Sequence, residues 1–186
     1  MLNRIEAIEI IDEYVNTDSL KKHLYAVEAS MKSYAIHYGE NPEEWGLAGL
    51  LHDYDWEICP NPEDHPVFGA NILREKGVPE NIVRAVLSHG DHTGIKRETL
   101  MEKTLFAVDE LSGFVTAVAL VRPSKSLSDV DVRAVKKKMK DKGFAKTINR
   151  EDIIKGAVEL ERDLDEHIEF VINSLKPISE ILGLYN

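Results

Sequence analysis

The sequence has very little cysteine and no long apolar run. A single cysteine, Cys59, among 186 residues excludes an internal disulfide and a cysteine-rich zinc site, so any metal must be held by His, Asp or Glu. No apolar run approaches the roughly 20 residues that cross a bilayer. The first nine residues carry Glu6 and Glu9 inside their apolar pattern, unlike a secretory signal. These absences favour a cytoplasmic protein with no membrane partner.

Positive charge is also scarce. The chain has 23 Lys and Arg against 33 Asp and Glu, a formal net charge of -10. This excess of acid disfavours nucleic acid and anionic membranes as partners. A small anionic substrate is compatible with this net charge if cationic side chains or metal ions are concentrated where the substrate binds. With 43% apolar and 30% charged residues, 186 residues suffice for one globular domain with a substantial core.

No segment alternates apolar and polar residues over a length that would predict a β-strand. The spacing of the apolar residues predicts an all-α fold. We expect one domain over residues 1–186, with a metal-binding core at about 20–120 and a C-terminal helical extension at about 124–186. Apolar residues of the last helix predict internal packing by default and a homodimer face as the alternative. The expected helices span residues 3–14, 20–38, 42–51, 62–77, 78–89, 98–121 and 151–175.

Metal-type side chains interrupt the apolar faces of separate predicted helices. His52 and Asp53 follow the apolar run at 45–51, and buried His and Asp cost free energy unless they are hydrogen-bonded or bound to a metal. His23 and Asp109 fall on the apolar faces of two other helices. A helical bundle can project such residues into one central site. Imidazole and carboxylate ligands suit Zn, Fe, Mn or Ni.

The order His23, His52-Asp53, Asp109 resembles the H…HD…D pattern of the HD superfamily of metal-dependent phosphohydrolases. The context Ala48-Gly-Leu-Leu-His-Asp is typical of that superfamily, and the resemblance covers about residues 20–120. It implies an HD-domain helical bundle with a metal site at its centre. It also implies that these four side chains hold one divalent ion, with Asp53 and His52 as catalytic residues.

A second group of histidines resembles the extended, HDIG-type pattern. His65-Pro-Val-Phe-Gly-Ala and the later Ser88-His89-Gly-Asp-His92 lie where those relatives hold a second metal. The resemblance implies one or two divalent transition metals (Fe, Mn, Zn, Ni or Co), with Asp53 bridging to a second ion on His65 and His89. His92 is a further ligand candidate. The Gly-Tyr-Pro signature of cyclic-di-GMP phosphodiesterases is missing, so the resemblance does not extend to that substrate.

The activity implied is hydrolysis of a phosphoester or phosphoanhydride in a small phosphorylated compound, expected to be a nucleotide, by metal-activated water without a covalent enzyme intermediate. Two alternatives remain: a nucleotide-sensing HD module without turnover, and a di-iron oxygenase-type HD enzyme. His65 and His89 also fit plain helix-end positions.

Supporting roles fall on further residues. Arg122, Lys125 and His92 are the candidates for substrate contact, and the lysines of residues 136–140 fit either phosphate contact or a solvated helix face. Asp55 or Glu57 is expected to hydrogen-bond a ligand histidine. The remaining histidines, His37 and His167, are expected at the surface or at helix ends.

Overall fold

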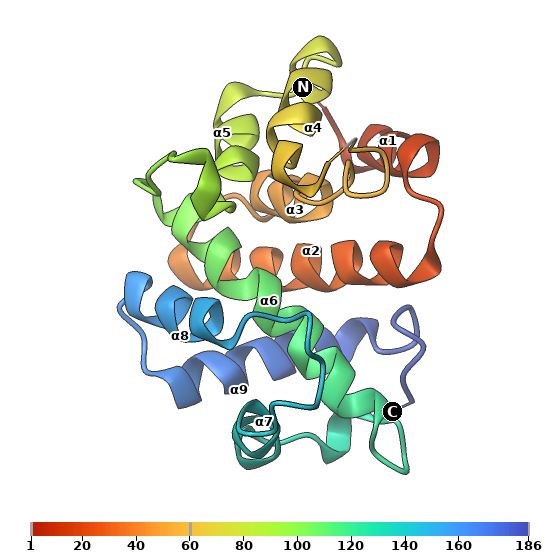
Figure 1. The fold of residues 1–186 in the computed structure, drawn as a ribbon, viewed down its shortest axis with the longest axis vertical. Helices are drawn as coiled ribbons and strands as arrows, with labels where there is room; N and C mark the ends of the chain where they lie inside the picture. The colour runs from red at the N-terminus through yellow and green to blue at the C-terminus, as the bar shows by residue number, and fades with distance from the viewer. Residues whose placement is uncertain (1, 60, 186) are drawn as a thin grey trace.

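The computed structural model describes residues 2–59 and 61–185, in which the α-helices form an all-α fold (Figure 1). Side chains set the helix ends: Asn3 accepts hydrogen bonds from the first turn of α1 (Arg4–Tyr14), and Thr17 caps α2 (Asp18–Tyr38). Gly39, at φ 74°, ends α2 in the left-handed conformation that glycine adopts without strain. The other α-helices are α3 (Pro42–Leu51), α4 (Val67–Glu75), α5 (Glu80–Ser88), α6 (Leu100–Leu120), α7 (Val132–Met139), α8 (Arg150–Glu159) and α9 (Leu164–Leu175).

Two long helices, α2 and α6, organise the molecule. In Figure 1, α2 runs across the middle, with α1, α3, α4 and α5 above it and α7, α8 and α9 below. Helix α6 crosses α2 and packs against α5 on one side and α8 and α9 on the other. The predicted all-α fold is therefore confirmed. No helix within the described part of the chain is long and apolar enough to cross a membrane.

The C-terminal region differs from the sequence prediction. The single helix expected over residues 151–175 is wrong, because α8 ends at Glu159 and α9 begins at Leu164. Glu161 between them has φ 55°, and the side chain of Asp163 accepts hydrogen bonds from the first turn of α9. An aspartate that caps a new helix start competes with helix continuation. The predicted internal packing is confirmed, since Leu160, Ile168, Val171 and Leu175 are buried.

His167 lies near the start of α9, one of its two predicted places, but it is fully buried, so the surface alternative is wrong. Its Nε2 donates to the carbonyl of Ala107 at 2.9 Å, and its Nδ1 accepts from the Tyr34 hydroxyl at 2.6 Å. Burial lowers the pKa of His167 to about 4, so the ring is neutral at pH 7. This histidine ties α9 to both central helices.

Candidate metal centre

Four side chains converge where α2, α3 and α6 meet. His23 lies in the second turn of α2, and Asp109 lies near the middle of α6. His52 is the residue at which α3 ends, and Asp53 follows it in a turn. Because α3 stops there, the His52 and Asp53 side chains can approach one point although they are adjacent in sequence.

The distances within this first donor set are short. The Nε2 atoms of His23 and His52 lie 3.2 Å apart, and the Asp109 Oδ1 lies 3.0 and 3.3 Å from them. The Asp53 Oδ2 lies 3.7 Å from the first and 3.5 Å from the second of these nitrogens. Ligand atoms that share one transition-metal ion at about 2.0–2.2 Å are separated by roughly 3.0–3.5 Å. The spacing therefore fits a single ion held by all four groups.

Protonation also favours a cation at this point. The Nδ1 of His52 donates to the carbonyl of Gly49 at 2.7 Å, which leaves the Nε2 lone pair facing the other donors. Burial alone would lower the pKa of His52, but the carboxylates of Asp53 and Asp109 outweigh it and raise the pKa to about 9. The cluster thus attracts positive charge, as a metal site of this ligand type does.

A second donor set shares Asp53. The Nε2 atoms of His65 and His89 lie 3.2 Å apart, and the Oδ1 of Asp53 lies 3.0 Å from the first and 3.3 Å from the second. The Oδ2 of the same carboxylate faces His23 and His52. Asp53 therefore stands between two groups of donors, each able to hold a metal ion.

Buried hydrogen bonds orient the second set. The Nδ1 of His65 donates to Asp55 at 2.8 Å, and the other oxygen of Asp55 accepts from the backbone N–H of Gly69 at 2.8 Å. A Cβ at Gly69 would lie 2.5 Å from the Asp55 Cγ, so glycine is required by this close approach. The Nδ1 of His89 donates to the carbonyl of Val86. Both rings thus present Nε2 to Asp53.

The two candidates for supporting a ligand histidine behave differently. Asp55 is buried against His65, and burial raises the pKa of its carboxyl, but the hydrogen bond and charge of His65 together with the hydrogen bonds from Cys59 and Gly69 outweigh burial and lower the net pKa. Glu57 instead accepts hydrogen bonds from Asn16 and Thr17, at the start of α2. Glu57 therefore supports a helix end and does not contact a histidine of either donor set.

A cavity of about 520 Å³ opens over both donor sets. His92 lines it, but its Nε2 donates to the His65 carbonyl, so that nitrogen is already engaged. Burial and the adjacent charge of Asp109 raise the pKa of Glu110, another lining residue, to about 7. The remaining walls include Trp56, Phe106, Thr147, Asn149 and Asp152. Sequence reasoning did not single out Glu110, Thr147, Asn149 or Asp152 for this site.

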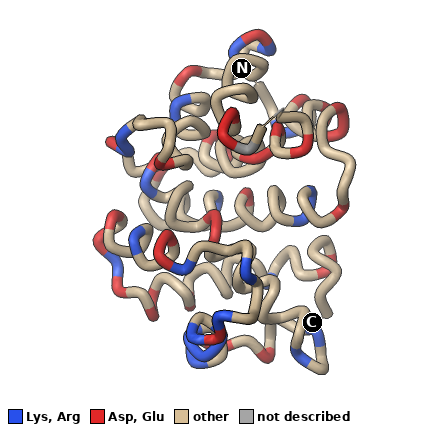
Figure 2. The backbone as a smooth tube through the Cα atoms, viewed as in Figure 1, with Lys and Arg blue, Asp and Glu red and all other residues tan. Residues whose placement is uncertain are grey.

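The predicted phosphate-contacting cations lie elsewhere. Arg122 follows Asp109 by 13 positions on α6 and the turn after it, about 20 Å at the helical rise, and it lines another cavity with Lys137 and Lys138. Lys125 lies in the turn next to Tyr185. Figure 2 shows the basic residues of α7 clustered at the end of the molecule away from the site. The structure does not bring these cations to the donor sets.

A comparison with protein families agrees with this geometry. The HD domain family matches residues 20–114, just over half of the chain, and this range contains all six donor residues. No solved structure matches the chain significantly. HD domains bind divalent metals and form a superfamily of metal-dependent phosphohydrolase type. The sequence resemblance is thereby confirmed, and this chain belongs to the HD domain family.

Proposed function

We propose that this protein is a metal-dependent phosphohydrolase that cleaves a phosphoester or phosphoanhydride in a small phosphorylated compound, with nucleotides as the expected class. One observation supports it above the others: Asp53 directs Oδ2 to one donor set and Oδ1 to a second, at 3.0–3.7 Å. A shared carboxylate between two imidazole sets is an arrangement suited to two divalent ions side by side. All six donors line or adjoin one open cavity.

The chain's own groups would divide the work. Two bound divalent ions would supply a hydroxide nucleophile at neutral pH and offset the negative charge of the phosphoryl group. His52 and Asp53 hold their positions because one is fully buried and hydrogen-bonded to Gly49, and the other is flanked by four histidines. Such fixed donors need no rearrangement when the substrate's charge changes during the reaction. Nothing in this division of labour requires a covalent enzyme intermediate.

The test uses protein stripped of metal and reloaded separately with Mn, Fe, Co, Ni or Zn. We expect hydrolysis of p-nitrophenyl phosphate and of a nucleotide panel only after loading, and a loss of at least a hundredfold in Asp53→Asn. His37→Ala, at an exposed histidine, is the matched control and should retain activity. Metal uptake and nucleotide binding without release of phosphate would instead indicate a sensing module. Oxygen consumption by the iron-loaded protein would indicate oxygenase chemistry.

A further inference from the structure

The walls of the metal cavity are acidic and neutral beyond the metal donors. Glu110 and Asp152 line it, together with the hydroxyl-bearing Thr147 and the amide-bearing Asn149. Asp152 accepts a hydrogen bond from the Asn149 side chain at 2.7 Å. Among the described residues that line this cavity, none is Lys or Arg. A phosphate chain would therefore meet no cation from the protein on these walls.

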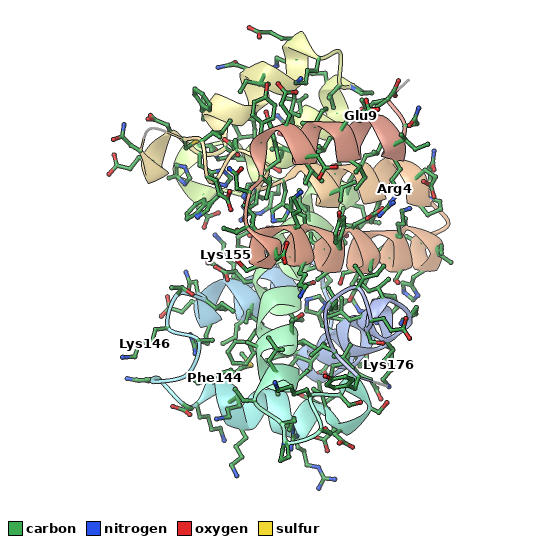
Figure 3. All side chains as sticks on the ribbon, turned by 90° about the vertical axis from the view of Figure 1, so that its right-hand side faces the viewer. Arg4, Glu9, Phe144, Lys146, Lys155 and Lys176 are labelled. Atoms are coloured by element: carbon green, nitrogen blue, oxygen red, sulfur yellow. The ribbon has the colours of Figure 1, made fainter. Side chains whose placement is uncertain are left out.

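The nearest cations are engaged or directed elsewhere. Asp91, at the cavity's edge, pairs with Lys155 at 2.5 Å and with Arg97 at 2.8 Å. Lys146 is exposed, and Figure 3 shows it pointing outward from the segment between α7 and α8. Lys96 and Lys103 line a neighbouring cavity that shares Asp91 with this one. Phosphates beyond the first would face Glu110 and Asp152 before any free cation.

We propose that the substrate carries a single phosphoryl group and an otherwise uncharged remainder rich in hydroxyl or amine donors, and that di- and triphosphates are poor substrates. This inference rests on the proposed function, because bound metal must offset the charge of the one phosphate. Carboxylates and amide or hydroxyl oxygens accept hydrogen bonds from sugar hydroxyls and amines, whereas the same carboxylates repel additional phosphates. Specificity then comes from repulsion of additional phosphates as well as from hydrogen bonds to the uncharged remainder of the substrate.

An aromatic surface completes this subsite. Trp56 is about half exposed, lines the cavity, and contacts the His65 ring edge to face at 5.1 Å. Phe106 also lines the cavity from α6, but it is only 5% exposed and the Arg97 guanidinium lies 3.7 Å from its ring centroid. The exposed indole of Trp56 therefore supplies the aromatic face that can pack on a nucleobase or on the apolar face of a sugar. Nucleoside monophosphates and sugar monophosphates therefore match the wall chemistry.

The test compares ligands that differ only in phosphate number. We would measure kcat/KM for adenosine 5′-mono-, di- and triphosphate, and calorimetric Kd values for their non-hydrolysable methylene analogues, at pH 8 and constant free metal. We expect the monophosphate to be favoured at least tenfold in both measurements. Glu110→Gln and Asp152→Asn should each reduce the preference for the monophosphate over the triphosphate severalfold, because each change removes a negative charge but keeps an acceptor oxygen. Lys146→Ala is the matched control and should leave the ratio unchanged.

The outcomes separate this inference from the proposed function. No hydrolysis of any phosphoester by loaded protein would contradict the proposed function, while the Kd ratio would still test the charge preference. Equal or tighter binding of the triphosphate analogue would overturn the inference. A triphosphate preference that disappears in Lys103→Ala would overturn it as well, and would assign the neighbouring cavity to the additional phosphates. Unaltered ratios in both carboxylate variants would also contradict it.

Discussion

The Nε2 atoms of His65 and His89 face each other at 3.2 Å, while the Nδ1 of each ring is hydrogen-bonded, to Asp55 and to the Val86 carbonyl respectively. With Nδ1 as the donor, each neutral ring presents a lone pair at Nε2. Two lone pairs at this distance repel each other unless a positive charge lies between them. A raised pKa of about 9 for His65 supports this argument: burial opposes it, but the hydrogen bonds to Asp53 and Asp55 and the charges of these two carboxylates together outweigh burial.

The number of metal ions per chain follows from this geometry. Protein purified without chelator should contain two ions, and His65→Ala should contain about one. Asp53→Ala should fall below one, because both donor sets use that carboxylate. Elemental analysis of the purified proteins measures this directly. His37→Ala, at an exposed histidine, should retain two ions. One ion in the wild type, unaffected by His65→Ala, would restrict the site to His23, His52, Asp53 and Asp109.

Asp55 should control the second ion without touching it. In Asp55→Asn the new amide faces two N–H donors, from His65 and from the Gly69 backbone, and its oxygen can accept from only one of them. Groups that orient a ligand histidine typically change metal affinity by about 10–100-fold. We therefore expect the second ion to bind 10–100-fold more weakly and the first to be unchanged, as measured by competition with a chelator.

Glu57→Gln is the matched control for Asp55→Asn. Glu57 accepts from Asn16 and Thr17 at the start of α2, so its loss should cost about 0.5–1 kcal/mol of stability, as the loss of a helix cap does. Its metal affinity should equal that of the wild type. An equal loss of the second ion in both variants would show that Asp55 acts through general stability and not through His65.

Much of the site was predictable because its residues break local patterns. His23 and Asp109 interrupt apolar helix faces, and His52-Asp53 follow an apolar run, so each position is visible in the sequence. The start of α1 and both ends of α2 were predictable for the same local reason, since Asn3, Thr17 and Gly39 mark them. The helical spacing of apolar residues is also a local pattern, which is why the all-α fold could be predicted from the sequence.

The remaining features depend on contacts between distant segments. Glu110, Thr147 and Asn149 share a cavity wall only because the segment before α8 folds back along α6. The sequence made Arg122 a candidate for substrate contact, but the length of α6 places it far from Asp109. His167 follows ordinary helical spacing, and its burial becomes apparent only from its hydrogen bonds to Tyr34 and Ala107. No periodic pattern in the sequence predicts such contacts between distant segments.

His167 should make folding stability depend on pH in a defined window. Its pKa is about 4 in the folded protein, against the ordinary value of 6.5, because burial disfavours the charged ring. Between pH 6.5 and 4 the unfolded chain binds a proton that the folded chain does not, so stability falls as pH falls through this range. The neutral His167 ring contributes its full stabilisation above pH 6.5. This stabilisation, about 3 kcal/mol, is lost completely once the pH falls below the folded-state pKa of about 4.

Urea unfolding at pH 7.5 and 4.5 measures this contribution when the wild type is compared with His167→Gln. The variant should be less stable at pH 7.5, because both buried hydrogen bonds are altered. It should also lose less stability on acidification, since it has no ring to protonate. The other titrating groups are common to both proteins and cancel in the difference. Parallel losses in the two proteins would contradict a neutral buried His167.

Arg150 should act on substrate affinity by fixing the cavity wall. Its guanidinium donates to the carbonyls of Phe144, Ala145 and Ile148, so it holds the segment that presents Thr147. A lysine ammonium carries its three N–H donors on one nitrogen and lacks the planar fork, so Arg150→Lys cannot reproduce the contacts that Nη1 and Nη2 of Arg150 make from two positions. We expect KM to rise severalfold, kcat to stay within about twofold, and metal content to be unchanged, because the donor sets lie on other helices.

Steady-state kinetics on the phosphorylated compound that the metal-loaded protein hydrolyses fastest, together with elemental analysis, measure these quantities. The matched control is Arg133→Lys, which makes the same chemical change at a side chain of α7 that is 95% exposed. That variant should retain the wild-type KM. A fall in kcat at constant KM, or loss of metal in Arg150→Lys, would show that the segment before α8 supports the metal centre itself. A rise in KM alone is the result expected if this wall contacts the substrate.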